Sequence, residues 1–153
     1  MLGPCGKSPY APGTMGSLLA FLCAFLLAPF IDAKGFWLLV LVSAIIGYYA
    51  AHRYEQITKI HDDKKVVIDE LSGLWLCYAF FPLTFPNLLA GFILFRLFDI
   101  VKPWPIGWVD KHMKGGLGVM LDDWLAGLMA ALVWYMVLRT IEGHLPFIAP
   151  AHK

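Results

Sequence analysis

Residues 120–141 of the chain read MLDDWLAGLMAALVWYMVLRTI, in which two adjacent carboxylates, Asp122 and Asp123, are followed by an almost uninterrupted apolar segment, Trp124–Ile141. A helix needs about 20 apolar residues to cross a bilayer, and this segment comes close to that length with its flanking residues. Ionisable groups inside such a segment are costly and usually lie at its boundary or face a polar cavity. The stretch therefore predicts a membrane helix that begins with an acidic pair.

Four more apolar segments precede this one and share its character. They are Leu18–Ile31, Phe36–Ala51, Leu71–Phe85 and Leu88–Ile100. The chain of 153 residues is 59% hydrophobic and 15% charged, against about 25% charged residues in an ordinary soluble domain. We expect one membrane-embedded domain over residues 1–153, an all-α polytopic bundle of about four to five helices. The two short segments between residues 71 and 100 either cross the bilayer as a tight hairpin or enter it only in part.

The charged residues are distributed unevenly between the two ends of such a bundle. If every segment crosses, residues 1–17, 52–70 and 101–123 lie on one face, and the other polar stretches lie on the opposite face. The first face holds most of the Lys and Arg residues, which marks it as cytoplasmic. It also holds nearly all of the Asp and Glu residues, so we expect the carboxylates to converge on the cytoplasmic side.

Two acidic pairs are the candidate metal ligands. Asp69–Glu70 opens the third apolar segment as Asp122–Asp123 opens the fifth. Small residues follow each pair by one turn, at Gly73 and at Ala126–Gly127, and small residues let helices approach closely. Four neighbouring carboxylates repel one another unless a cation neutralises them, and such oxygen ligands favour magnesium, calcium or manganese over zinc. The alternative is that each pair only stabilises the start of its own helix.

Basic residues accompany a third acidic position in the fourth segment. Arg96, Asp99 and Lys102 are spaced i, i+3, i+6, which predicts one helix face near the cytoplasmic end. Arg96 or Lys102 would hold an anionic phosphate, and Asp99 would be a further metal ligand. The alternative is an Arg–Asp ion pair with a Lys that reaches towards the interface.

The segment SPYAPGTMGS, residues 8–17, leads into the first helix and is a weaker candidate anion site. Thr14 and Ser17 can cap the helix, and the glycines let backbone amides approach a phosphate. The segment lacks the Lys and the spacing of a P-loop, so no nucleotide is expected. The net charge of +1 offers no basic excess for a nucleic acid. Residues 61–63 (HDD) are expected to form a solvated loop, with a metal-ligand role as the alternative, and residues 115–118 (GGLG) a mobile loop.

Taken together, five motifs resemble the phosphatidylglycerophosphatase A family. They are PGTMGS at 12–17, HD at 61–62, VIDELSG at 67–73, FRLFDIVKPWPIGWVD at 95–110 and GGLGVMLDDWLAG at 115–127. The resemblance implies a helical protein of the bacterial inner membrane, with a cytoplasmic active site that uses magnesium to convert phosphatidylglycerophosphate to phosphatidylglycerol. The site positions that it carries over are Asp69, Glu70, Asp99, Asp110, Asp122 and Asp123, with Arg96 and Lys102. Family members usually have a further stretch before the first motif, where this chain begins.

The predicted mechanism places one or two magnesium ions among the carboxylates. The predicted metal ligands are Asp69, Glu70, Asp99, Asp122 and Asp123. Arg96, Lys102 and the amides of residues 13–17 would stabilise the phosphate oxygens, and Asp110 or one of the acidic pairs would accept a proton from the attacking water. Direct attack by an Asp is left open, as are two other functions: phosphatase activity on another lipid phosphomonoester, and cation transport.

Overall fold

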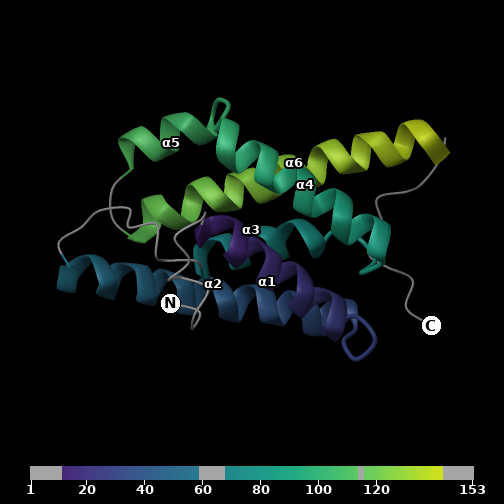
Figure 1. The fold of residues 1–153 in the computed structure, drawn as a ribbon, viewed down its shortest axis with the longest axis horizontal. Coiled ribbons are helices and arrows are strands. Elements are labelled where there is room, and N and C mark those ends of the chain that lie inside the picture. Colours follow the sequence, from purple (N-terminus) through teal and green to yellow (C-terminus); the bar gives the residue numbers. More distant parts are fainter. Residues whose placement is uncertain (1–11, 59–67, 114–115, 143–153) are drawn as a thin grey trace.

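The computed structural model describes residues 12–58, 68–113 and 116–142, and every regular element within these ranges is an α-helix. The all-α prediction is therefore confirmed for the described part of the chain. In chain order (Figure 1), the helices are α1 Pro12–Leu27, α2 Ala33–Thr58, α3 Ile68–Tyr78, α4 Phe85–Val101, α5 Ile106–His112 and α6 Gly116–Glu142.

Helix α3 lies at the centre of the bundle and packs against α1, α2, α4 and α6. Its sequence, IDELSGLWLCY, is apolar on nearly all sides after the acidic pair, and a helix of this kind is normally buried. Leu74 and Cys77 are fully buried, and Trp75 donates a hydrogen bond from its indole to the backbone oxygen of Ala20 on α1 at 2.9 Å. The apolar pattern of this segment thus reflects burial within the protein.

The helices alternate in direction, so that the polar stretches of the sequence meet at one end. Figure 1 shows that α1, α3 and α6 start at the end of the bundle where α2 and α4 finish, with α5 at that same end. The sequence placed residues 1–17, 52–70 and 101–123 together, and the described parts of those ranges do lie at one end. We call it the polar end.

Among the described residues, two helices are long and apolar enough to cross a membrane, in the segments Ala33–Ala50 and Met120–Ile141. Helix α3 has only 11 residues and α4 has 17, so the expected four to five crossings are not confirmed. Large side chains on α2 and α6 are nevertheless exposed, among them Leu38 at 61% and Leu132 at 59%. Contiguous exposed apolar surface of this kind marks a membrane or partner contact in proteins generally.

Helix boundaries differ from the sequence prediction mainly between residues 101 and 118. The expected polar loop contains α5, and α6 already begins at Gly116, so the mobile loop predicted for residues 115–118 is wrong from residue 116 onwards. A Cβ atom on Gly118 would collide with the backbone oxygen of Met113. The glycine there allows two backbones to approach closely. Residues 61–63 lie outside the described residues.

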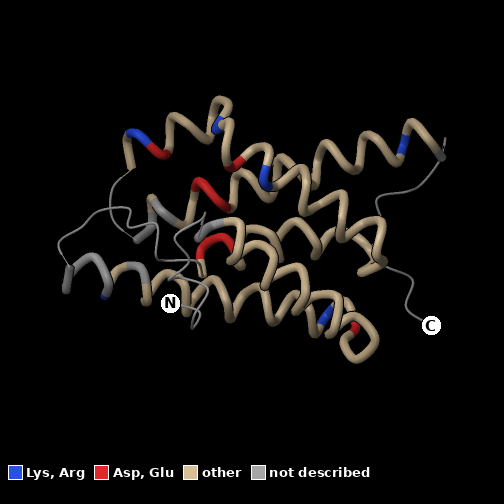
Figure 2. Tube along the Cα trace, in the orientation of Figure 1, with Lys and Arg blue, Asp and Glu red and all other residues tan. Residues whose placement is uncertain are grey.

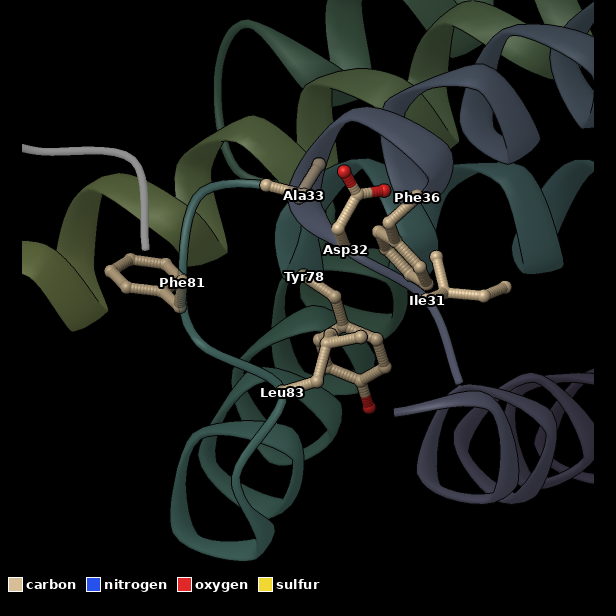
Figure 3. A pocket seen from close by; sticks show the side chains of 8 residues that line it. Ile31, Asp32, Ala33, Phe36, Tyr78, Phe81 and Leu83 are labelled. Carbon is tan, nitrogen blue, oxygen red and sulfur yellow. The ribbon is translucent and has the colours of Figure 1, made fainter. Parts of the chain in front are cut away.

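The opposite end of the bundle holds a small, mainly apolar pocket (Figure 3) between the α1–α2 turn and the α3–α4 turn. Its one acidic residue, Asp32, accepts a hydrogen bond from the backbone N–H of Gly35 at 2.8 Å. Tyr78 donates its hydroxyl to the backbone oxygen of Leu88 at 2.8 Å. These polar groups are satisfied locally, and the pocket lies away from the acidic pairs.

Candidate active site

The acidic residues of α3, α4 and α6 gather at the polar end of the bundle (Figure 2), as the sequence predicted. Asp69 and Glu70 lie in the first turn of α3. Asp122 and Asp123 lie in α6, which begins six residues earlier at Gly116, and no acidic residue occupies the first turn of that helix. The expectation that the second pair opens a helix is therefore wrong, and a capping role does not explain why it is there.

Helices α3 and α6 cross in close contact one turn beyond the two acidic pairs. A Cβ atom on Gly73 would lie 2.6 Å from the backbone oxygen of Asp123, and one on Gly127 would collide with the backbone oxygen of Gly73. The predicted close approach at these glycines is confirmed. Because backbone meets backbone here, the crossing holds Asp69 and Asp123 near each other at the start of the contact.

Arg96 is the centre of a first group of charges, the arginine cluster, which joins α1, α3 and α4. Its Nη1 atom lies 2.6 Å from Asp99 Oδ2 and 3.3 Å from Glu70 Oε2. Ser17 donates its hydroxyl to the same Glu70 oxygen at 2.8 Å, and Arg96 Nη2 donates to the hydroxyl of Thr14 at 3.3 Å. Thr14 is exposed, so the cluster reaches the surface beside α1.

Glu70 has a higher pKa than an ordinary carboxylate. Burial raises its pKa to about 7, although Arg96 and the Ser17 hydroxyl act in the opposite direction. The charges of Asp99 and Asp122 contribute to this increase in the pKa of Glu70. The influence of Asp122, which lies on α6, shows that the two acidic pairs affect each other electrostatically.

Lys102 is the centre of a second group, the lysine cluster, which joins the end of α4 to α5 and α6. Its Nζ atom lies 2.6 Å from Asp110 Oδ1 and 2.8 Å from Asp122 Oδ2. Burial alone would lower the pKa of Lys102, but the hydrogen bonds to the two carboxylates outweigh that effect and raise it. The side chain is therefore a permanent cation between α5 and α6.

The predicted single face of Arg96, Asp99 and Lys102 does not exist beyond Asp99. Lys102 adopts the left-handed conformation, with φ 45° and ψ 57°, and its N–H bonds to the oxygen of Phe98 as the cap of α4. Because α4 ends at Val101, the Lys102 side chain contacts Asp110 on α5 and Asp122 on α6 and not the residues around Arg96. The two basic residues consequently flank the acidic pairs from separate clusters.

Asp69 and Asp123 are the buried carboxylates that have no basic partner among the described residues. They are 6% and 4% exposed. Asp69 Oδ1 accepts the backbone N–H of Glu70 at 2.9 Å, and the Asp123 carboxylate accepts no hydrogen bond from the described part of the chain. Burial raises the pKa of Asp69 well above its usual range, only partly opposed by that N–H, and the charges of Glu70 and Asp122 add to the increase.

These two carboxylates fit a magnesium ion by the chemistry of their donor atoms. An unpaired buried charge costs several kcal/mol, and a cation between the helices would remove that cost. Within the described ranges, no three His, Cys, Asp or Glu residues are grouped so as to hold an ion by themselves. Magnesium commonly uses only one or two carboxylates and completes its shell with water and substrate phosphate.

The sequence of the chain is similar to those of known proteins. The sequence model of the family described as phosphatidylglycerophosphatase A matches residues 1–138. The chain belongs to the phosphatidylglycerophosphatase A family. It is 38% identical over 133 residues to the phosphatidylglycerophosphatase A of Escherichia coli (strain K12), covering 86% of this chain and 77% of that protein. It is 34% identical over 128 residues to the Haemophilus influenzae protein of the same name, covering 83% of this chain and 78% of the relative.

A further relative, from Bacteroides thetaiotaomicron, is named as a candidate phosphatidylinositol-3-phosphatase. It is 37% identical over 137 residues, covering 84% of each chain. No solved structure matches this chain. Membership of the phosphatidylglycerophosphatase A family makes the protein a phosphoric monoester hydrolase, and together with the two apolar helices it indicates association with a membrane.

In this phosphatidylglycerophosphatase A family member, the first motif forms the start of helix α1, and its role in binding phosphate stays a prediction. Helix α1 begins at Pro12, so the backbone amides of Gly16 and Ser17 lie in its second turn, where carbonyls four residues earlier normally use them. Thr14 and Ser17 do not cap the helix. Their hydroxyls instead bind Arg96 and Glu70.

Two polar residues that the sequence analysis did not single out brace the acidic pairs. Trp124 Nε1 donates to Ser72 Oγ at 2.9 Å, and Ser72 Oγ donates to the backbone oxygen of Asp69 at 2.9 Å. Ser72 is fully buried. These bonds tie the start of α3 to α6 beside the glycine crossing. The signal in the sequence is position: Ser72 follows Asp69 by one turn, and Trp124 directly follows the second pair.

Proposed function

We propose that this protein hydrolyses phosphatidylglycerophosphate to phosphatidylglycerol at the cytoplasmic face of a bacterial inner membrane, and that it requires magnesium. The family and the names of two relatives support the substrate. The observation that carries the chemistry is the pair of buried carboxylates, Asp69 and Asp123, which have no basic partner among the described residues and lie between two clusters that each contain a cation.

Asp69 and Asp123 would hold the magnesium ion, and Asp122, a further predicted ligand, forms an ion pair with Lys102 at 2.8 Å. When bound, the ion neutralises the charge of the phosphate oxygens and favours ionisation of a water molecule. Glu70 and Asp99 remain predicted ligands. In the structure both contact Arg96, at 3.3 Å and 2.6 Å, so in the absence of substrate they hold the guanidinium in place.

Arg96 would orient the phosphate. A guanidinium has five N–H donors in a planar fork that can bind two phosphate oxygens at once. Here Nη2 points to the exposed hydroxyl of Thr14, the part of the arginine cluster that an incoming anion can reach. Ser17 and Asp99 would fix the opposite side of the fork. Lys102 adds positive charge from the lysine cluster.

Glu70 is the preferred proton acceptor. A general base works best when its pKa lies near the operating pH, and burial raises that of Glu70 to about 7. Asp110, the other predicted base, is 31% exposed and forms an ion pair with Lys102 at 2.6 Å. It would therefore act chiefly by positioning Lys102.

The deciding experiment is phosphate release from purified protein in detergent micelles. We expect phosphatidylglycerophosphate to be hydrolysed in magnesium and not in EDTA, with phosphatidate and phosphatidylinositol 3-phosphate as competing substrates. Faster hydrolysis of phosphatidylinositol 3-phosphate would favour the activity suggested by the name of the Bacteroides relative. Full activity in EDTA would refute the magnesium assignment.

A multi-pass topology with the polar end in the cytoplasm is part of the same proposal. Single cysteines at Lys111 and Lys34, introduced into a cysteine-free parent, should react with an impermeant reagent from opposite sides of the membrane. Lys111 lies on α5 and Lys34 in the first turn of α2. Labelling of both from one side would contradict the topology. The transporter alternative is not favoured, because the carboxylates of α3, α4 and α6 gather at one end of the bundle rather than along a path through it.

A further inference from the structure

Helix α5 presents two tryptophans outwards at the polar end of the bundle. Trp104, just before the helix, is 81% exposed, and Trp108, four residues on, is 52% exposed. The opposite side of the helix is apolar and inward: Ile106 is fully buried and Val109 is 8% exposed. The tryptophans are therefore not needed to pack α5 onto the bundle, and their exposure requires another explanation.

In the last turn of α5, Lys111 adds a positive charge beside the tryptophans. Lys111 and His112 are both exposed. The His112 ring stacks on Trp108, with centroids 4.8 Å apart and an interplanar angle of 19°. The acidic residue of the helix, Asp110, is neutralised by Lys102 at 2.6 Å. The outward surface of Trp104, Trp108, Lys111 and His112, here called the α5 strip, is thus aromatic and cationic.

The α5 strip continues an exposed apolar surface on α4. Leu97, Ile100 and Val101 at the end of α4 are 52%, 70% and 63% exposed, and Trp104 follows them directly. On its other side the helix carries Asp110, which contacts the lysine cluster. The strip therefore lies between a surface suited to acyl chains and the charged site.

We propose that the α5 strip lies in the headgroup layer of the bilayer and binds anionic phospholipid there. Trp and Tyr rings concentrate at membrane–water boundaries because they are apolar with one polar edge, and Lys residues beside a membrane are attracted to anionic lipid. The match of a cationic aromatic strip to an anionic interface selects the lipid surface over a protein partner. The proposal rests on the proposed function, in which the substrate is an anionic lipid.

Anchoring α5 would set the depth of the active site relative to the lipid phosphates. Lys102 links Asp110 on α5 to Asp122 on α6, at 2.6 and 2.8 Å. A Cβ atom on Gly107 would lie 2.6 Å from the backbone oxygen of Lys102, so the start of α5 fits closely against the end of α4. A strip held at the headgroup level would therefore hold the carboxylates at a fixed height below it.

Fluorescence quenching tests the position of the strip without using enzyme activity. The parent and a Trp104→Phe/Trp108→Phe variant are reconstituted in vesicles of equimolar phosphatidylcholine and phosphatidylglycerol. The quenchers are phospholipids brominated near the glycerol end or near the methyl end of the acyl chain. We expect the emission lost in the variant to be the part quenched more strongly by the shallow bromines. Trp75→Phe is the matched control, because Trp75 is 8% exposed and its emission should be quenched weakly by both.

If the lost emission is quenched by neither lipid, α5 faces water or a protein, and the proposal is wrong. Stronger quenching by the deep bromines would place the strip in the acyl core and equally overturn it. Both results are readable even if the protein hydrolyses none of the lipids tested, so failure of this inference differs from failure of the proposed function.

Enzyme kinetics test whether the α5 strip also contributes to catalysis at the active site. Trp104→Ala/Trp108→Ala should lower catalytic efficiency on substrate in vesicles by on the order of tenfold, because apolar contact with the interface is lost. Hydrolysis of a short-chain, water-soluble phosphomonoester of the same headgroup should not change. An equal loss on both substrates would mean that the tryptophans act through the fold, and would refute the role in membrane positioning.

Discussion

Asp123→Asn tests whether the site depends on the buried charge of Asp123 or on the shape of its side chain. The carboxylate is 4% exposed, and no Lys or Arg within the described ranges forms an ion pair with it. Asparagine keeps the volume and removes the charge. In metal-free protein the neutral side chain should be easier to bury, so the variant should unfold at a higher temperature than the parent. In magnesium the order should reverse, because only the parent gains a bound ion.

The sizes of these shifts follow from the burial. Relieving an unpaired buried charge is worth several kcal/mol per ion, and we take about 2 kcal/mol for one of several interacting carboxylates. At about 2–4 °C per kcal/mol for a chain of this length, the metal-free apparent Tm should rise by about 4–8 °C. Magnesium at 100 times its Kd should stabilise the parent by about 2.7 kcal/mol, and should leave the variant nearly unchanged.

The assay is thermal unfolding in detergent, in EDTA and in magnesium, together with phosphate release. Turnover should fall by about 100-fold or more, since a bound metal contributes several kcal/mol to the transition state. Asp110→Asn is the control: that side chain is 31% exposed and paired with Lys102, so its neutralisation should not raise the metal-free Tm. If Asp123→Asn keeps both the magnesium-dependent stabilisation and normal turnover, the metal site is not at Asp123.

Three further perturbations test other parts of the site. Lys102→Met removes a predicted contact with the substrate phosphate, about 1.5–3 kcal/mol for a charged hydrogen bond, and should lower kcat/KM by roughly 10- to 150-fold. An unchanged value would remove Lys102 from the site. Gly127→Ala forces a methyl group against the backbone oxygen of Gly73 and should destabilise the fold by about 1–3 kcal/mol. Gly47→Ala should cost less, because its methyl group meets the end of the flexible Met120 side chain. Equal Tm values for the two alanine variants would contradict the close crossing. Burial raises the pKa of Glu70 from 4.5 to about 7, so the folded state holds this proton more tightly than the unfolded state. The metal-free Tm should therefore fall as pH rises through this interval and level off above it. Glu70→Gln should reduce the slope of Tm against pH, and an identical slope in the two proteins would show that this carboxyl is not responsible.

The acidic pairs and their glycines could be predicted from the sequence because local spacing determines them. One helical turn separates Asp69 from Gly73 and Asp123 from Gly127, and this spacing puts a carboxylate and a backbone contact on one face of each helix. The structure confirms the crossing at these glycines. The convergence of charges at one end also followed from the alternation of apolar and polar segments, which does not depend on where each helix begins.

The features that escaped prediction depend on tertiary contacts. The left-handed conformation of Lys102, at φ 45°, has no signal in a stretch that continues the helical spacing of Arg96 and Asp99. The glycines before Asp122 favour a loop by propensity, yet α6 extends through them because Gly118 allows close contact with the backbone of Met113. Apolar character likewise does not determine the number of crossings, since a short helix at the centre of a bundle is as apolar as one in lipid.

The backbone crossing of α3 and α6 limits how this protein can change in length. Adding one residue between Asp123 and Gly127 would turn the carboxylate by about 100° around the helix axis, away from Asp69, while the glycine contact stayed in place. Insertions in the turn between α3 and α4, residues 79–84, carry no such penalty. Substrate range in this chain should therefore evolve by exchange of side chains around Arg96. The spacing of Asp69 from Gly73, and of Asp123 from Gly127, should stay constant.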